Sequence, residues 1–141
     1  MTSYVLDASA LLRFTDKEAG FERVQYLLVQ AAKGSCILLP SAVNWGEIVA
    51  AIFKRANCTQ PAILRASALM ANLLALPLTV IPATRELAED AAMFKCTHKV
   101  PFADAFAGSL ALHENATLVT ADYDFKRVPP GIVKIDFLPS K

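Results

Sequence analysis

Two short apolar stretches that end in an aspartate, Tyr4-Val5-Leu6-Asp7 and Leu118-Val119-Thr120-Ala121-Asp122, decide the fold that this sequence predicts. An apolar run of this length is typical of a buried strand, and in each stretch the acid follows the strand's carboxyl end. Between them, further short apolar runs alternate with longer segments in which apolar residues recur three or four positions apart. This alternation predicts an α/β fold with a mainly parallel central sheet that carries helices on both faces.

Local signals divide the chain into the elements of such a fold. Gly34 is typical of a helix end, Pro61 of a helix start, and Thr84 is a suitable helix N-cap. Strands are therefore expected at 4–6, 36–39, 78–81, 117–120 and 132–137. Helices are expected at 9–14, 21–32, 41–56, 61–76, 85–95 and 103–113.

The length of the chain fits one domain over residues 1–141. Apolar residues make up 55% of it and charged residues 19%, with a mean hydropathy of +0.39, which excludes intrinsic disorder. The segment 61–76 is apolar almost all round. We expect it either to pack in the core of the domain or to be covered by a second chain.

The sequence shows neither a membrane anchor nor the marks of secretion. No segment offers about 18 uninterrupted apolar residues, and the stretch 1–6 is too short and uncharged for a signal peptide. The three cysteines, Cys36, Cys58 and Cys96, are widely spaced and form no CxxC pair, so neither a disulfide framework nor a zinc site is expected. We therefore expect a cytoplasmic protein with no membrane partner.

Two acids lie where parallel sheets bind their ligands. Asp7 and Asp122 each follow a predicted strand, and Asp124 comes two residues after Asp122. Ligands of open α/β sheets bind beyond the carboxyl ends of the strands, so these acids are candidates for a binding site. The alternative for each is an ordinary turn residue or helix cap.

Two further acids occur on helix faces that are otherwise largely apolar. Glu47 and Asp104 both have mainly small or apolar neighbours at helical spacing, and a buried carboxylate there needs a partner. The alternatives are an ion pair of Glu47 with Lys54 or with an arginine elsewhere in the chain, and a first-turn position in which Asp104 favours the helix dipole. Gly108 lies in the same helix as Asp104 and indicates a close approach by another element.

If these acids converge, their mutual repulsion requires a cation. A divalent ion relieves repulsion that would otherwise protonate several of the carboxyl groups. An all-oxygen carboxylate site suits Mg²⁺ or Mn²⁺ rather than zinc, which prefers thiolate and imidazole ligands. His98 and His113 are the only histidines, and we expect them at the surface or at helix ends.

Four motifs, in order and at these intervals, resemble those of the PIN-domain ribonucleases, most closely the VapC-type toxins of prokaryotic toxin–antitoxin pairs. The motifs are Val5-Leu6-Asp7-Ala8-Ser9-Ala10-Leu11-Leu12, Asn44-Trp45-Gly46-Glu47, Phe102-Ala103-Asp104-Ala105 and Thr120-Ala121-Asp122-Tyr123-Asp124-Phe125. The resemblance implies that the metal is held by Asp7, Glu47, Asp104 and Asp122. It implies auxiliary roles for Ser9, Thr120 and Asp124, although both hydroxyls could simply bond the local backbone.

The resemblance also implies an activity and partners. The expected activity is a metal-dependent endoribonuclease that leaves 5′-phosphate and 3′-hydroxyl ends. A homodimer and a small antitoxin, whose tail blocks the active-site cleft, are the expected protein partners.

The net charge of +1 becomes +5 without the four proposed ligands, which suits a polyanion. Candidate RNA-binding residues, each of which could also be an ordinary surface charge, are Arg13, Lys54, Arg55, Lys99, Lys126 and Arg127.

Two other classes of protein could carry such acids. A PIN-like module that binds RNA or protein without cleaving it needs no complete acid set, so Glu47 and Asp104 argue against it. A signalling receiver domain also clusters acids at strand ends, but it needs a phosphate-accepting aspartate after a central strand. The predicted strands 36–39 and 78–81 lead into proline instead.

Overall fold

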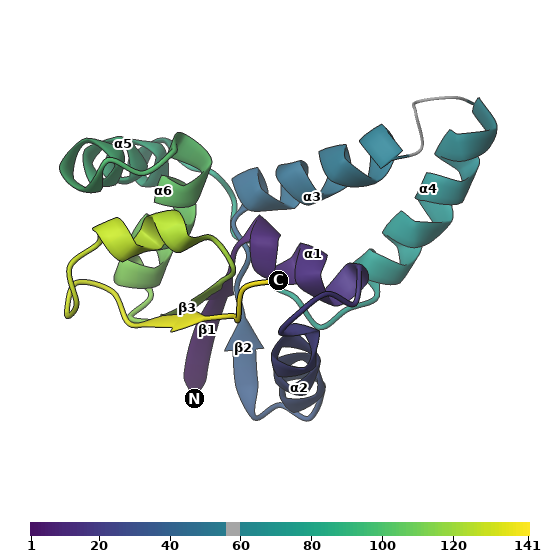
Figure 1. Ribbon diagram of the computed structural model, residues 1–141, viewed down its shortest axis with the longest axis horizontal. Coiled ribbons are helices and arrows are strands. Elements are labelled where there is room, and N and C mark those ends of the chain that lie inside the picture. Colours follow the sequence, from purple (N-terminus) through teal and green to yellow (C-terminus); the bar gives the residue numbers. More distant parts are fainter. Residues whose placement is uncertain (56–59) are drawn as a thin grey trace.

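A parallel sheet lies at the centre of the protein, in a computed structural model that describes residues 1–55 and 60–141 (Figure 1). Its strands are β1 (Thr2–Leu6), β2 (Cys36–Leu38), β3 (Thr117–Thr120) and β4 (Ile135–Phe137), in the order β2-β1-β3-β4. Cys58 and the last residue of the expected helix 41–56 lie outside the described residues. The predicted α/β class with a parallel central sheet is confirmed.

Helices cover both faces of this sheet because successive strand residues point to opposite sides. On one face, Val5 and Leu118 pack with α5 and α6. On the other, Leu6 and Val119 pack with the helices that come first in the chain. The α-helices are α1 (Ala8–Thr15), α2 (Phe21–Ala32), α3 (Ala42–Arg55), α4 (Gln60–Leu74), α5 (Arg85–His98) and α6 (Phe102–His113).

The ends of α5 show how local sequence fixes a helix. Thr84 is its N-cap, and the Thr84 hydroxyl accepts a hydrogen bond from the Leu87 amide at 3.1 Å. The helix ends at Lys99, whose backbone has a φ of +57° in the left-handed region. The cap predicted at Thr84 is therefore confirmed, and the helix runs three residues beyond the predicted end.

The strand expected at 78–81 does not form. The segment donates backbone hydrogen bonds from Thr79 to Leu38 and from Ile81 to Pro40, both at 2.9 Å, but it forms only one isolated bridge, between Ser41 and Ile81. The physical reason is proline: Pro40 has no amide hydrogen to extend the ladder, and Pro77 and Pro82 bound the segment on either side. The strand expected at 132–137 is shortened to β4, and a 3₁₀ helix, η1 (Tyr123–Arg127), follows β3.

The close approach predicted at Gly108 is confirmed. A Cβ atom at this position would lie 2.4 Å from Cζ of Phe94, so the phenyl ring of α5 rests directly on the backbone of α6. Phe94 is 5% exposed, and Gly108 is likewise buried. Glycine is therefore required here by packing rather than by backbone conformation.

In the described part of the chain, no helix is long and apolar enough to cross a membrane. The mainly apolar helix α4 lies beside α3, and the two extend away from the sheet in Figure 1. Ala66 and Leu73 of α4 are buried in the core, whereas Leu64, Leu69 and Leu74 are 74%, 55% and 70% exposed. Part of this helix thus packs in the core of the same chain, and part of it has no cover within the described residues.

Gly108→Ala tests the contact between α5 and α6. We expect the free energy of unfolding in urea to fall by about 1–3 kcal/mol, because the added methyl group must displace Phe94. Gly46→Ala in α3 is the matched control, since no described atom lies within 4 Å of a Cβ there. Helix propensity should stabilise that variant by up to about 1 kcal/mol. Equal stability changes in the two variants would contradict the packing account.

Candidate active site

Asp7 is buried at the point where β1 ends and α1 begins. Its Oδ1 accepts hydrogen bonds from the Ser9 hydroxyl at 2.6 Å and the Ala10 amide at 2.9 Å, so it caps α1. Its Oδ2 accepts a hydrogen bond from the Thr120 hydroxyl at 2.5 Å. Burial raises the pKa of Asp7 to about 6, although the bonds from Ser9, Thr120 and Ala10 act in the opposite direction.

Ser9 and Thr120 connect the ends of β1 and β3. The Ser9 hydroxyl accepts a hydrogen bond from the Ala121 amide, and the Thr120 hydroxyl accepts one from the Asp122 amide, both at 2.9 Å. The local backbone bonds anticipated for these hydroxyls therefore exist, but each hydroxyl also donates to Asp7. Together they hold the backbone of Asp122 beside the Asp7 carboxylate.

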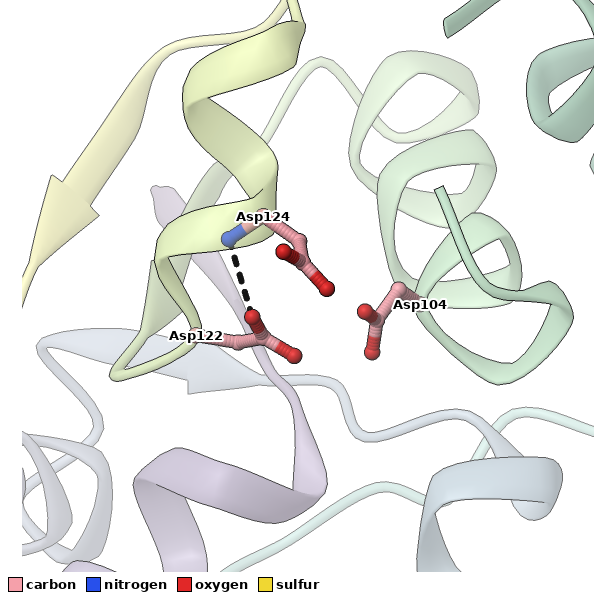
Figure 2. A group of neighbouring side chains, drawn as sticks. All are labelled: Asp104, Asp122 and Asp124. Atoms are coloured by element: carbon pink, nitrogen blue, oxygen red, sulfur yellow. Dashed lines mark hydrogen bonds between the residues drawn. The ribbon is translucent and has the colours of Figure 1, made fainter. Parts of the chain in front are cut away.

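Three other carboxyl groups face one another in front of Asp7. Asp122 caps η1 by accepting a hydrogen bond from the Asp124 amide at 2.9 Å, which places both side chains on one side of the site. Figure 2 shows Asp104, from the first turn of α6, facing them from the opposite side. One carboxylate oxygen from each of the three lies within 4.8 Å of the others. We call Asp104, Asp122 and Asp124 the acidic cluster.

Asp104 has the least favourable environment for a charge. Its Oδ2 is buried and, within the described residues, has no hydrogen-bond partner. Burial, a hydrogen bond with the Asp122 carboxyl group and the negative charges of Asp122, Asp7 and Glu47 raise the pKa of Asp104 to about 8. Asp7, Glu47 and Asp122 therefore all lie close enough to Asp104 to raise its pKa.

Glu47 lies at the exposed edge of this group. Its Oε1 accepts a hydrogen bond from the Asn44 side-chain amide at 2.8 Å, and no ion pair with Lys54 occurs among the described residues. Asn44 is 1% exposed and also donates to the backbone oxygen of Ala103 at 3.1 Å. It therefore joins Glu47 on α3 to the start of α6.

Asn44 is a positioning residue that sequence reasoning missed. The Ser41 hydroxyl donates to Asn44 Oδ1 at 2.9 Å, which leaves the Asn44 amide group free to donate to its other two partners. Its position three residues before Glu47, on the same helix face, was the available signal. A buried amide with all its groups bonded holds its neighbours rigidly.

The acidic cluster fits a small divalent cation. Its ligands would all be carboxylate oxygens, the set that Mg²⁺ and Mn²⁺ prefer. The unpartnered Oδ2 of Asp104 is a second, independent indication, because a buried carboxylate oxygen needs a hydrogen bond or a cation. Asp7 and Glu47 are not part of the cluster itself: Asp7 is buried and Glu47 is exposed, and both lie close enough to raise the pKa of Asp104.

Of the six candidate RNA-binding residues, Arg127 contacts the acidic cluster, and Lys99 and Lys126 lie next to Arg127. Arg127 Nη2 is 3.5 Å from Asp124 Oδ1, and Arg127 Nη1 donates to the backbone oxygen of Lys99 at 2.9 Å. Lys99 is itself exposed. Lys126, the residue before Arg127, is exposed too, and its Nζ lies 5.1 Å from the ring centre of Phe137.

The other three candidates lie elsewhere. Arg13 is 9% exposed, and its guanidinium donates to the carbonyl oxygens of Ala19 and Pro139 at 2.6 and 2.7 Å. This burial gives Arg13 a structural role, in place of the RNA-facing role expected from the sequence. Lys54 and Arg55 are the last residues of α3, whose C-terminal end points away from α6 in Figure 1.

The chain belongs to the PIN domain family, whose family model matches residues 4–130. A search of curated proteins found no significant match. The fold is shared with solved structures of VapBC toxin–antitoxin complexes and a VapC toxin. Family membership and fold thus agree with the resemblance that the four motifs indicated.

Three of these structures show how far the likeness extends. VapBC from Salmonella typhimurium, bound to DNA, has a TM-score of 0.71 at 16% identity, over 97% of this chain and 98% of that one. VapBC2 from Rickettsia felis, bound to a promoter fragment, has a TM-score of 0.68 at 16% identity, over 98% of this chain and 100% of that one. VapC20 from Mycobacterium tuberculosis, described as a toxin that cleaves the sarcin-ricin loop, has a TM-score of 0.60 at 19% identity. The match covers 93% of this chain and 98% of that one. At these identities the likeness shows the shared fold.

The raised pKa values predict that the metal-free protein loses stability as the pH rises from about 4 to about 8. Over this range the folded protein holds protons on Asp7 and Asp104 that the unfolded chain releases, so the free energy of unfolding falls. Asp104→Asn should remove most of this dependence. It should stabilise the protein at pH 8 by about 1–3 kcal/mol, a range reduced for solvent screening of a half-buried group.

Urea unfolding at pH 5 and pH 8 in EDTA measures this effect. Asp90→Asn is the matched control, because Asp90 is an exposed acid on α5. Its free energy of unfolding should equal that of the unsubstituted protein at both pH values. A parent protein that is equally stable at pH 5 and pH 8 would contradict the assignment of raised pKa values.

Asn44→Ala tests the positioning role of Asn44. The substitution removes the donors to Glu47 and to the Ala103 carbonyl, so we expect a loss of about 1–3 kcal/mol in stability. We also expect Mn²⁺ affinity to fall about tenfold or more, as for other residues that orient metal ligands. Calorimetric titration with Mn²⁺ measures it, and Asn72→Ala, at an exposed position of α4, is the control. An unchanged affinity would show that Asn44 is purely structural.

Proposed function

We propose that this protein is a metal-dependent endoribonuclease and the toxin of a type II toxin–antitoxin pair. The observation that carries the proposal is the acidic cluster with its unpartnered buried oxygen, in a chain of the PIN family. A nuclease needs positive charge where the phosphodiester binds. A divalent cation held by these acids would supply that charge. Residues 1–141 are proposed to act as one domain.

The proposed ligands of one or two Mg²⁺ or Mn²⁺ ions are Asp7, Glu47, Asp104 and Asp122, with Asp124 as a further acid in the cluster. Such ions lower the pKa of bound water, screen the phosphate and stabilise the leaving oxygen. Asp104 and Asp122 approach from opposite sides, so they can hold an ion between them. The expected products carry 5′-phosphate and 3′-hydroxyl ends.

The remaining polar residues fix the geometry of these acids. The Ser9 and Thr120 hydroxyls bond both Asp7 and the backbone that leads to Asp122, so they set the separation of the two carboxylates. Asn44 does the same for Glu47 relative to α6. Precise placement of ligands on rigid strand and helix ends favours hydrolysis because no reorganisation is needed during the reaction.

The proposed partners are an RNA substrate, a cognate antitoxin and a second copy of this chain. The exposed leucines of α4 support a protein partner, because an uncovered apolar helix face is typical of an interface. The complexes of Salmonella typhimurium and Rickettsia felis pair a VapC with a VapB chain, which supports an antitoxin. Cytoplasmic location is proposed on the same grounds, since an RNA-cleaving toxin must meet its substrate there.

Cleavage of total cellular RNA by the purified, antitoxin-free protein tests the proposal. Discrete fragments should appear with Mg²⁺ or Mn²⁺ and disappear with EDTA. Asp122→Asn should reduce the rate at least a hundredfold, because it removes one ligand and its charge. Asp90→Asn, far from the cluster in sequence and exposed, should cleave normally. Metal-dependent cleavage that survives Asp122→Asn would remove this residue from the site, and absence of both cleavage and metal binding would favour a non-catalytic PIN-like binding module.

A further inference from the structure

A basic groove lies directly beside the acidic cluster. It has a volume of about 650 Å³, and its charged lining residues are Lys95, Lys99 and Arg127. No carboxylate is among the residues that line it, and within the described chain Lys95 and Lys99 form no ion pair. Among the described residues Lys95 and Lys99 have no counter-charge and Arg127 pairs only with Asp124, so the groove has a local positive potential that suits a polyanion.

Two links join this groove to the acidic cluster. Arg127 lines the groove and lies 3.5 Å from Asp124 Oδ1. Phe102 lines it too, and it precedes Asp104 by two residues at the start of α6. A strand whose phosphate reached the cluster would therefore have Arg127 and Phe102 of the groove beside it.

The groove also presents an aromatic face. Phe102 is 46% exposed, and its ring stacks on that of Phe106, with ring centres 5.2 Å apart and planes inclined by 15°. Phe106 is 7% exposed, so it supports the outer ring from beneath. An exposed, rigid aromatic ring among cations is the arrangement on which unpaired bases stack.

The backbone of Lys99 has a conformation that is unfavourable for a residue with a side chain. Its φ of +57° lies in the left-handed region, which glycine or asparagine occupies more readily at a helix end. Neither of those residues would place a cation in the groove. Lysine at this position therefore adds a positive charge to the groove at the cost of a less favourable backbone conformation.

We propose that this groove binds the single-stranded RNA segment that adjoins the scissile phosphate. One unpaired base stacks on Phe102, and the phosphates beside it contact Lys95, Lys99 and Arg127. The inference rests on the proposed function in taking RNA as the ligand, and it adds which residues hold the strand beside the cluster: Phe102 for a base, and Lys95, Lys99 and Arg127 for phosphates. A base inside a duplex presents no free face to Phe102.

Binding of a labelled oligoadenylate of about eight nucleotides tests the proposal, with site sizes of this order being usual for single-strand grooves. Fluorescence anisotropy is measured in EDTA, so that the result does not depend on metal-assisted cleavage. Phe102→Leu should weaken binding about tenfold, because it keeps an apolar side chain but cannot stack. Phe102→Tyr should bind like the parent protein. Tyr26→Leu, at an exposed aromatic position on α2, is the matched control and should have no effect.

A second readout separates stacking from a merely structural role. A 2-aminopurine base in the oligonucleotide should be quenched by the parent and by Phe102→Tyr, but not by Phe102→Leu. Lys95→Ala and Lys99→Asn, which suits the left-handed backbone, should each lower the slope of log affinity against log salt by about 0.7. Lys33→Ala, at the end of α2, should leave the slope unchanged. Thermal unfolding of each variant confirms that it is folded.

Several results would overturn the proposal. Equal affinity of Phe102→Leu and the parent would exclude stacking, and equally tight binding of a duplex would exclude a requirement for unpaired bases. A change in molar mass on Phe102→Leu would assign the ring to an interface between copies of this chain. An acidic peptide that binds as tightly and shows the same loss would assign the groove to a protein partner. If binding behaves as expected and RNA is not cleaved, the groove stands and the nuclease proposal fails.

Discussion

The hydrogen bond from Thr120 to Asp7 is the interaction on which the site depends. It joins the carboxyl ends of β1 and β3, which are neighbours in a parallel sheet and therefore end at the same edge. Once Thr120 is fixed against Asp7, its hydroxyl also fixes the Asp122 amide, and Asp122 in turn fixes Asp124. The positions of three acids thus follow from the register of two strands.

This arrangement has an electrostatic cost. Asp104 approaches the end of β3 from α6, and burial together with three nearby carboxylates raises its pKa far above that of a free aspartate. A fold selected for stability alone would place an apolar side chain there. The structure retains the carboxyl group and leaves one of its buried oxygens unpartnered, which is the behaviour expected of a site that a cation completes.

The sequence predicted those parts of the fold that depend on local signals. The helix 21–32, the cap at Thr84 and the close approach at Gly108 follow from spacing, capping and packing rules, and the structure has all three. The strand at 78–81 failed because its pairing depends on Pro40, which comes from another part of the chain. The structural roles of Asn44 and Arg13 could not be predicted from the sequence for the same reason. Their partners, Ala103 and Pro139, are distant in sequence and contact them only after folding.

The central claim is that a divalent cation binds at the acidic cluster, with Asp104 and Asp122 among its ligands. Anomalous diffraction from crystals of the protein soaked in Mn²⁺ tests it most directly, because the signal locates the ion itself. The account predicts a peak between these carboxylates, with Mn–O distances of about 2.0–2.3 Å, near those of other hard divalent ions. A crystal that binds Mn²⁺ elsewhere, or shows no peak here at saturating Mn²⁺, would contradict it.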